Sequence, residues 1–88
     1  MQTIRLLISG KVQGVWYRKS TLAKAKEFNL QGTVRNLEDG RVEVIASGSK
    51  DKVNQLVDWC KRGPDLAEVE SIELKEIEDQ FFSEFKVL

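Results

Sequence analysis

Apolar and polar residues alternate from the start of the chain. Between Thr3 and Ser9, every second residue is a large aliphatic one: Ile4, Leu6 and Ile8. Successive side chains of a β-strand point to opposite faces, so this alternation predicts a strand with one face in the core and the other exposed.

Four later segments are also predicted to be strands. They are 33–37, 41–47, a stretch beginning at Ile72, and 82–88. The first two are joined by Glu38-Asp39-Gly40, and an Asp-Gly pair in this position is typical of a β-hairpin. The residues expected to face the core are Val42, Val44 and Ala46 in the strand 41–47, and Phe85 and Val87 share one face of the last strand.

Two segments have the spacing of amphipathic helices. Residues 18–28 contain no Gly or Pro, and the expected inner side chains are Leu22, Ala25 and Phe28. The second helix has Ser49 as its N-cap and ends at Gly63-Pro64. Its apolar residues Val53, Leu56, Val57 and Cys60 fall at positions i, i+3, i+4 and i+7, the spacing of one helical face.

The predicted order is strand, helix, strand, strand, helix, strand, with a short extra strand at the end. This order is that of the ferredoxin-like split βαβ fold, an α+β class with the pattern βαββαβ. A mostly antiparallel, mixed sheet would carry both helices on one face. The 88 residues are enough for one such domain, 1–88.

Charge and composition narrow the possible functions. Lys plus Arg and Asp plus Glu number 14 each, so the net charge is zero, whereas general nucleic-acid binders carry a basic surplus. The chain has no histidine and a single cysteine, Cys60, which excludes Cys–His catalysis, nearly every zinc site and an internal disulfide. Cys60 lies on the apolar stripe and is interpreted as a core thiol.

The chain shows no targeting or membrane signal. Arg5 interrupts the first apolar run, which is too short for a signal peptide, and no segment is long enough to span a membrane. These features and the lack of an internal disulfide lead us to expect a cytoplasmic protein. We expect a monomer, because no apolar stripe is left over for a partner.

A glycine-containing segment, Gly10-Lys11-Val12-Gln13-Gly14-Val15-Trp16-Tyr17-Arg18, joins the first strand to the first helix. Its glycines permit a curled loop whose N–H groups point inward, and a helix N-terminus adds unpaired N–H groups and partial positive charge. Arg18 would contribute a guanidinium that binds phosphate or carboxylate with two hydrogen bonds. The loop is neither a Walker A sequence nor a dinucleotide motif. A turn without a ligand remains the alternative.

The predicted topology brings Asn36 to the same place. A strand–helix–strand crossover makes the first two strands parallel, so their carboxyl ends and the start of the helix between them share one edge. The helix spans about 16 Å, and a few residues of strand return the chain over that distance. Asn36 would then lie near Arg18. Its alternative role is to stabilise the hairpin turn.

Two segments resemble the signature motifs of the acylphosphatases: residues 10–18 and Gly32-Thr33-Val34-Arg35-Asn36-Leu37-Glu38-Asp39-Gly40-Arg41-Val42-Glu43-Val44. The resemblance extends to residues 46–48, to Gly63-Pro64 with Ala67 and Val69, and to residues 85–87. It implies hydrolysis of the carboxyl–phosphate bond of a small acyl phosphate, without metal or cofactor. It also implies that the backbone of Val12, Gln13, Gly14, Val15, Trp16 and Tyr17 binds the phosphoryl group together with Arg18. Asn36 would orient the attacking water.

The chain departs from the family pattern at two positions. Tyr17 stands where phenylalanine is usual, which adds a hydroxyl beside the loop, and Thr33 replaces an aromatic residue near Asn36. Trp16 has two possible roles, contact with the substrate or an exposed position without contact.

Two other functions compete with acyl phosphate hydrolysis. A non-catalytic module that binds a phosphate-type anion would use the same loop. An RNA-binding domain shares the topology, but the strand 41–47 has no aromatic residue for base stacking. We therefore expect no nucleic-acid and no membrane partner.

Overall fold

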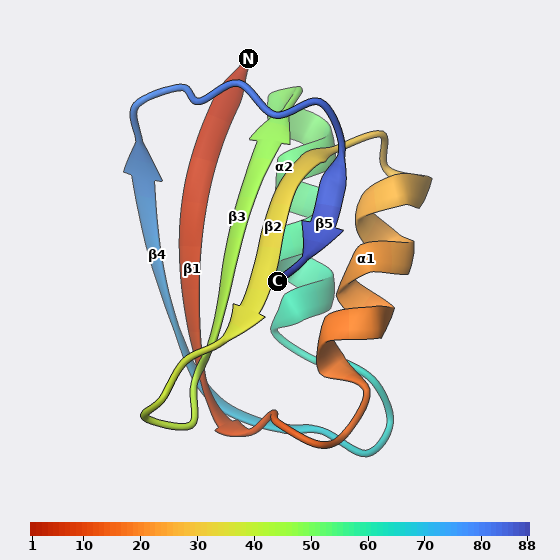
Figure 1. Cartoon of the computed structure of the whole chain (residues 1–88), viewed down its shortest axis with the longest axis vertical. Helices are drawn as coiled ribbons and strands as arrows, with labels where there is room; N and C mark the ends of the chain where they lie inside the picture. Colours follow the sequence, from red (N-terminus) through yellow and green to blue (C-terminus); the bar gives the residue numbers. More distant parts are fainter.

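The computed structural model describes residues 1–88 as a five-stranded sheet with two helices on one face (Figure 1). The elements are β1 (Gln2–Lys11), α1 (Tyr17–Glu27), β2 (Gln31–Asn36), β3 (Val42–Gly48), α2 (Lys50–Cys60), β4 (Glu68–Ile77) and β5 (Phe85–Val87). The strand order is β4-β1-β3-β2-β5, and only the β2–β5 pair is parallel. The predicted ferredoxin-like fold with an extra terminal strand is confirmed.

The strand register explains the core. β1 pairs with β3 so that Ile4 lies opposite Ala46, Leu6 opposite Val44 and Ile8 opposite Val42. Opposite residues of an antiparallel pair share a face, so these six side chains form one apolar layer. All six are buried, as the alternation along the sequence predicts.

Helix α2 closes this layer from one side. Ser49 is its N-cap and accepts a hydrogen bond from the Lys52 N–H at 3.4 Å. The predicted stripe is buried along its whole length: Val53, Leu56, Val57 and Cys60. The N-cap and the inner face of α2 are both confirmed.

Helix α1 differs from its prediction on the inner face. It begins one residue earlier than expected, and Leu22 and Phe28 are only partly buried. Its buried residues are Tyr17, Thr21 and Ala25. The two hydroxyls tolerate burial because both are paired: Tyr17 donates to the Cys60 carbonyl at 2.6 Å and Thr21 to the Tyr17 carbonyl at 2.7 Å.

The outer strands also differ from the prediction. β4 begins at Glu68 rather than Ile72, because Gly10 and Lys11 extend β1 past a bulge and pair with Val69 and Glu68. Leu74 is 51% exposed although it lies opposite buried Leu6, because β4 is an edge strand beside which neither helix lies (Figure 1). The last strand is only Phe85–Val87, and Val87 is exposed.

Candidate active site

The loop between β1 and α1 ends at an open helix N-terminus. Trp16 is the N-cap residue, but its side chain accepts no capping hydrogen bond, and the first turn of α1 contains no acidic residue. The first N–H that bonds within the helix is that of Ser20, to the Trp16 carbonyl at 3.0 Å. The preceding N–H groups of the first turn therefore remain available for an anion, with the positive end of the helix dipole behind them.

Three buried side chains hold this loop in place. The side chains of Val12, Val15 and Tyr17 are buried, whereas Gly14 and Trp16 are exposed. Gly14 and Trp16 have φ angles of 74° and 68°, in the left-handed region that L-residues with side chains rarely adopt. The buried side chains thus fix a tightly curled backbone, and Gly14 and Trp16 remain on its solvent-exposed side.

Arg18 lies in the first turn of α1, close to the end of β5. Its Nη1 donates a hydrogen bond to the Leu88 carbonyl at 3.3 Å. Leu88 is held in turn by its own N–H, which donates to the Val34 carbonyl of β2 at 2.9 Å. The guanidinium is therefore positioned beside β5 while most of its donors stay free.

Asn36 is the last residue of β2, at the edge where β1 also ends. Its Oδ1 is buried and accepts no hydrogen bond. Buried polar atoms without a partner are rare in folded proteins. The Asn36 amide therefore keeps hydrogen-bonding capacity that the fold does not use.

The structure brings Arg18 and Asn36 to one cleft of about 440 Å³. Its lining residues are Val12, Gly14, Trp16, Tyr17, Arg18, Lys19, Asn36 and Val87. Of the predicted site residues, the side chain of Val15 is turned into the core and that of Gln13 contacts the β2–β3 hairpin. The prediction for both residues concerns their backbone N–H groups and not these side chains.

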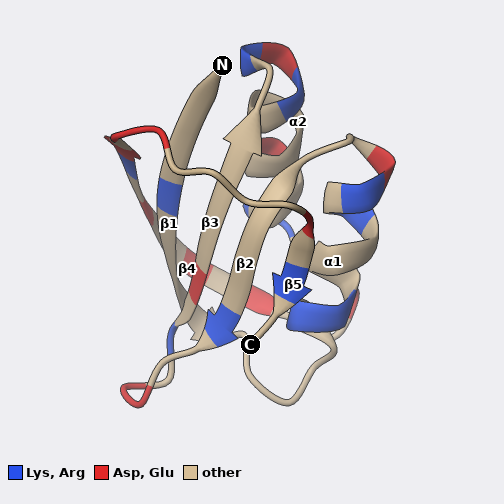
Figure 2. Cartoon of the chain, turned by 45° about the horizontal axis from the view of Figure 1, so that its top comes forward, with Lys and Arg blue, Asp and Glu red and all other residues tan.

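The charge of the cleft differs from that of the whole chain. Two lining residues, Arg18 and Lys19, are positive and none is acidic, although the net charge of the chain is zero. Figure 2 shows these positive residues at the start of α1, next to a loop without charges. A neutral protein thus presents a local positive field to an anion.

Sequence reasoning missed two lining residues. Lys19 was expected only on the outer face of the first helix, and Val87 only to share one face of the last strand with Phe85. The signal for Lys19 was its place in the first helical turn directly after Arg18. Nothing in the sequence indicated that β5 would pair with β2 and bring Val87 to the cleft.

The two unusual titratable groups near the cleft are structural. Burial raises the pKa of Tyr17, whose hydroxyl lies in the core against α2 rather than beside the loop. Burial also raises the pKa of Cys60 to about 12, so the thiol stays protonated at neutral pH and is no nucleophile. No three His, Cys, Asp or Glu side chains are grouped to hold a metal ion, and no helix is both long and apolar enough to cross a membrane.

Comparisons with known proteins agree over nearly the whole chain. A family model described as Acylphosphatase matches residues 4–87. An acylphosphatase of Methylococcus capsulatus is 48% identical over 89 residues, covering 100% of this chain and 97% of the relative. The structure of an acylphosphatase from Coxiella burnetii aligns with a TM-score of 0.95 at 40% identity, covering 99% of this chain and 92% of that one. The structure of an acylphosphatase from Bacillus subtilis aligns with a TM-score of 0.96 at 30% identity, covering 100% of this chain and 99% of that one.

Proposed function

The chain belongs to the acylphosphatase family and is an enzyme that hydrolyses acyl phosphates. From this premise we propose that the reaction takes place in the cleft between the loop 12–17 and Asn36. The observation that carries the proposal is that one cleft holds both an uncapped, positively charged helix start and Asn36, whose buried Oδ1 has no hydrogen-bond partner.

The loop and Arg18 hold the phosphoryl group. The backbone N–H groups of Val12 to Tyr17 surround its oxygens, and the Arg18 guanidinium adds a fixed positive charge with donors still free. Phosphoryl transfer depends mainly on positioning and on stabilising the charge of the equatorial oxygens. A cleft that supplies donors and no acidic side chain suits this task.

Asn36 orients the attacking water. Its amide binds the water by a hydrogen bond and directs an oxygen lone pair at phosphorus, in line with the acyl oxygen. The new water-oxygen–phosphorus bond forms as the phosphorus–carboxyl-oxygen bond breaks. A phosphate oxygen takes the proton of the water, and the carboxylate leaves with the bonding electron pair. A carboxylate is a good leaving group, so no histidine acid or base is required.

The remaining features of the proposed enzyme concern its setting. We take residues 1–88 to act as one domain, as a monomer in the cytoplasm, on a small-molecule acyl phosphate. Its sole cysteine is buried, which agrees with a protein that needs no disulfide. Analytical ultracentrifugation tests this: the sedimentation coefficient of a monomer should not rise with protein concentration.

The first test is hydrolysis of benzoyl phosphate in the presence of a chelator. We expect the wild type to turn over and Asn36→Ala to lose about 100-fold or more in kcat, as for the loss of one positioned transition-state donor. Inorganic phosphate should still inhibit the variant. Asn54→Ala, at an exposed position on α2, is the matched control and should behave as the wild type.

Arg18→Ala gives the complementary result. Loss of its charge should cost about 3–4 kcal/mol of transition-state stabilisation and weaken phosphate inhibition. Near-normal turnover by a folded Arg18→Ala or Asn36→Ala protein would contradict the assigned roles. Phosphate binding without turnover by the wild type would favour a non-catalytic anion-binding module.

A further inference from the structure

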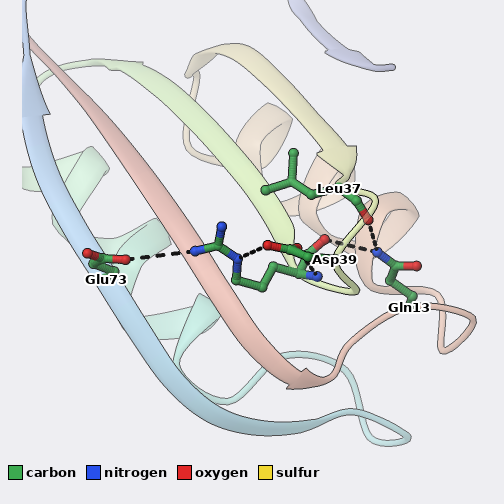
Figure 3. A network of polar contacts seen from close by, with 5 residues as sticks. Gln13, Leu37, Asp39 and Glu73 are labelled. Carbon is green, nitrogen blue, oxygen red and sulfur yellow. Dashed lines mark hydrogen bonds and ion pairs between the residues drawn. The ribbon is translucent and has the colours of Figure 1, made fainter.

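The side chain of Gln13 connects the phosphate loop to the β2–β3 hairpin. Its Nε2 donates to the Leu37 carbonyl at 2.9 Å and to the Arg41 carbonyl at 3.0 Å (Figure 3). The two contacts use both hydrogens of one amide nitrogen. They join residues 24 and 28 positions apart in the sequence.

The two carbonyls that Gln13 binds are also the ones that close the hairpin. The Leu37 N–H donates to the Arg41 carbonyl at 2.8 Å, and the Gly40 N–H donates to the Leu37 carbonyl at 3.2 Å. Gln13 therefore attaches at the base of the hairpin and not at its tip. Leu37 follows Asn36 directly, so this attachment point is one residue from the Asn36 amide.

The other contacts of the hairpin side chains are at the surface. Asp39 accepts hydrogen bonds from the Arg41 N–H at 3.1 Å and from its Nε at 2.8 Å. Arg41 also lies 3.9 Å from a carboxylate oxygen of Glu73 on β4, and both acidic partners are exposed (Figure 3). Exposed ion pairs contribute little to holding a segment in place. The partly buried amide of Gln13 is better suited to that task.

We propose that the Gln13 side chain is a positioning residue that sets the distance between the bound phosphoryl group and Asn36. This inference rests on the roles proposed above for the loop and for Asn36. The backbone of Gln13 belongs to the phosphate loop, and its side chain holds the strand end that carries the water-binding amide. A shift of about 1 Å between two reacting groups is enough to slow a reaction about 100-fold.

Gln13→Met tests the proposal because methionine has a similar length and no donor. We expect kcat for benzoyl phosphate to fall about 10- to 100-fold. The inhibition constant of inorganic phosphate should change less than about threefold, because the loop N–H groups and Arg18 remain. Gln55→Met, at an exposed position on α2, is the control. An unchanged kcat, or a loss of phosphate affinity equal to the loss of kcat, would overturn the proposal.

Combining this change with Asn36→Ala shows whether Gln13 acts through Asn36. If it does, Gln13→Met should cost less than about threefold in the Asn36→Ala background, since residues that act as a unit are not additive. If Gln13→Met lowers kcat as much in the Asn36→Ala background as in the wild type, Gln13 does not act through Asn36 and the positioning role is refuted. Near-normal activity of Asn36→Ala alone would instead refute the proposed function, so the two failures are distinct.

Gln13→Glu supplies a second variant, which also serves if Gln13→Met does not fold. An ionised carboxylate cannot donate to the two carbonyls, but a protonated one donates a single hydrogen bond. We therefore expect the activity of Gln13→Glu relative to the wild type to rise as pH falls toward about 4.5, near the usual pKa of glutamic acid. A ratio that does not change with pH would count against the proposal.

Discussion

Trp16 is exposed to 67% although it is the N-cap of α1 and lines the cleft. It also adopts a left-handed φ of 68°, a conformation that is costly for a bulky residue. The Lys19 ammonium lies 5.7 Å from the centre of its ring, on the same side of the helix start. This strained, exposed ring belongs to the loop proposed to bind the phosphoryl group, and it is well placed to contact the acyl part of a substrate.

Trp16→Ala should therefore discriminate between acyl groups. An aromatic contact stabilises by about 0.5–1.5 kcal/mol, so kcat/KM for benzoyl phosphate should fall about 3- to 10-fold more than that for acetyl phosphate. Trp16→Phe retains a ring, so its losses of kcat/KM for the two substrates should differ less. Steady-state kinetics on both substrates measure this difference, and an equal loss for the two would show that the ring does not contact the acyl group.

At the residue scale, the sequence was informative where topology and motif point to the same side chain. Arg18 and Asn36 each have common alternative uses, and they could be named because the predicted topology brings both to one edge and both lie in motifs that resemble those of the acylphosphatases. Gln13 was named only for its backbone, because no local pattern shows that its side chain reaches two carbonyls on another hairpin. Such contacts depend on the folded arrangement of distant segments.

The two helices begin in different ways. α2 has a Ser49 cap and Asp51 in its first turn, whereas α1 has neither a side-chain cap nor an acidic residue. Caps and acidic residues stabilise a helix by satisfying its free N–H groups and its positive end. In the proposed enzyme, the bound phosphoryl group supplies this stabilisation to α1.

Reversing the charge at the start of α1 should weaken anion binding. We expect Lys19→Glu to raise the inhibition constant of phosphate about tenfold at low salt. The effect should shrink as ionic strength rises, because Lys19 is exposed. Lys26→Glu, in the last turn of the same helix, is the matched control. Equal effects of both changes would mean that net charge, and not the helix start, is responsible.

At the scale of elements, regular apolar patterns predicted the buried faces well. Buried polar side chains whose hydroxyls are hydrogen-bonded were not predicted. The apolar stripe of α2 and the alternation of β1 and β3 were sufficient to predict their buried faces. The inner face of α1 was predicted only in part: Ala25 is buried as expected, but Tyr17 and Thr21, with paired hydroxyls, are buried where Leu22 and Phe28 were expected to be. The start of β4 was wrong because β1 continues past a bulge at Ser9 and Gly10, an extension that the alternation between Thr3 and Ser9 does not predict.

On the open face of the sheet, one carboxylate connects three strands. Glu43 on β3 accepts hydrogen bonds from Arg5 on β1 and Arg35 on β2, both at 2.8 Å. Burial of this carboxylate acts to raise its pKa, but the hydrogen bonds and positive charges of Arg35 and Arg5 outweigh it and hold the pKa below its usual value. The folded protein therefore favours the ionised form.

The free energy of unfolding should consequently depend on pH. Because the unfolded chain binds this proton more readily, the contribution of Glu43 is present above its usual pKa of 4.5 and is lost as pH falls through the lower folded pKa. Glu43→Gln should lower the free energy of unfolding by about 1–2 kcal/mol at pH 7. It should also reduce the loss of stability that the wild type shows as pH falls below 4.5. Urea unfolding from pH 3 to 7 measures this. If the variant loses as much stability at low pH as the wild type, the pH dependence arises from other carboxyl groups.

The sheet order has a kinetic consequence for the whole molecule. β3 lies between β1 and β2, and β5 pairs with β2 from the far end of the sequence. The loop 12–17 follows β1 and Asn36 ends β2, so they meet only after both strands have docked on β3. Pairings between distant segments form late and slowly in folding. If catalysis needs both the loop 12–17 and Asn36, as proposed, a chain with only part of the sheet assembled lacks the complete site, and activity should return in refolding no earlier than the docking of β1 and β2 on β3.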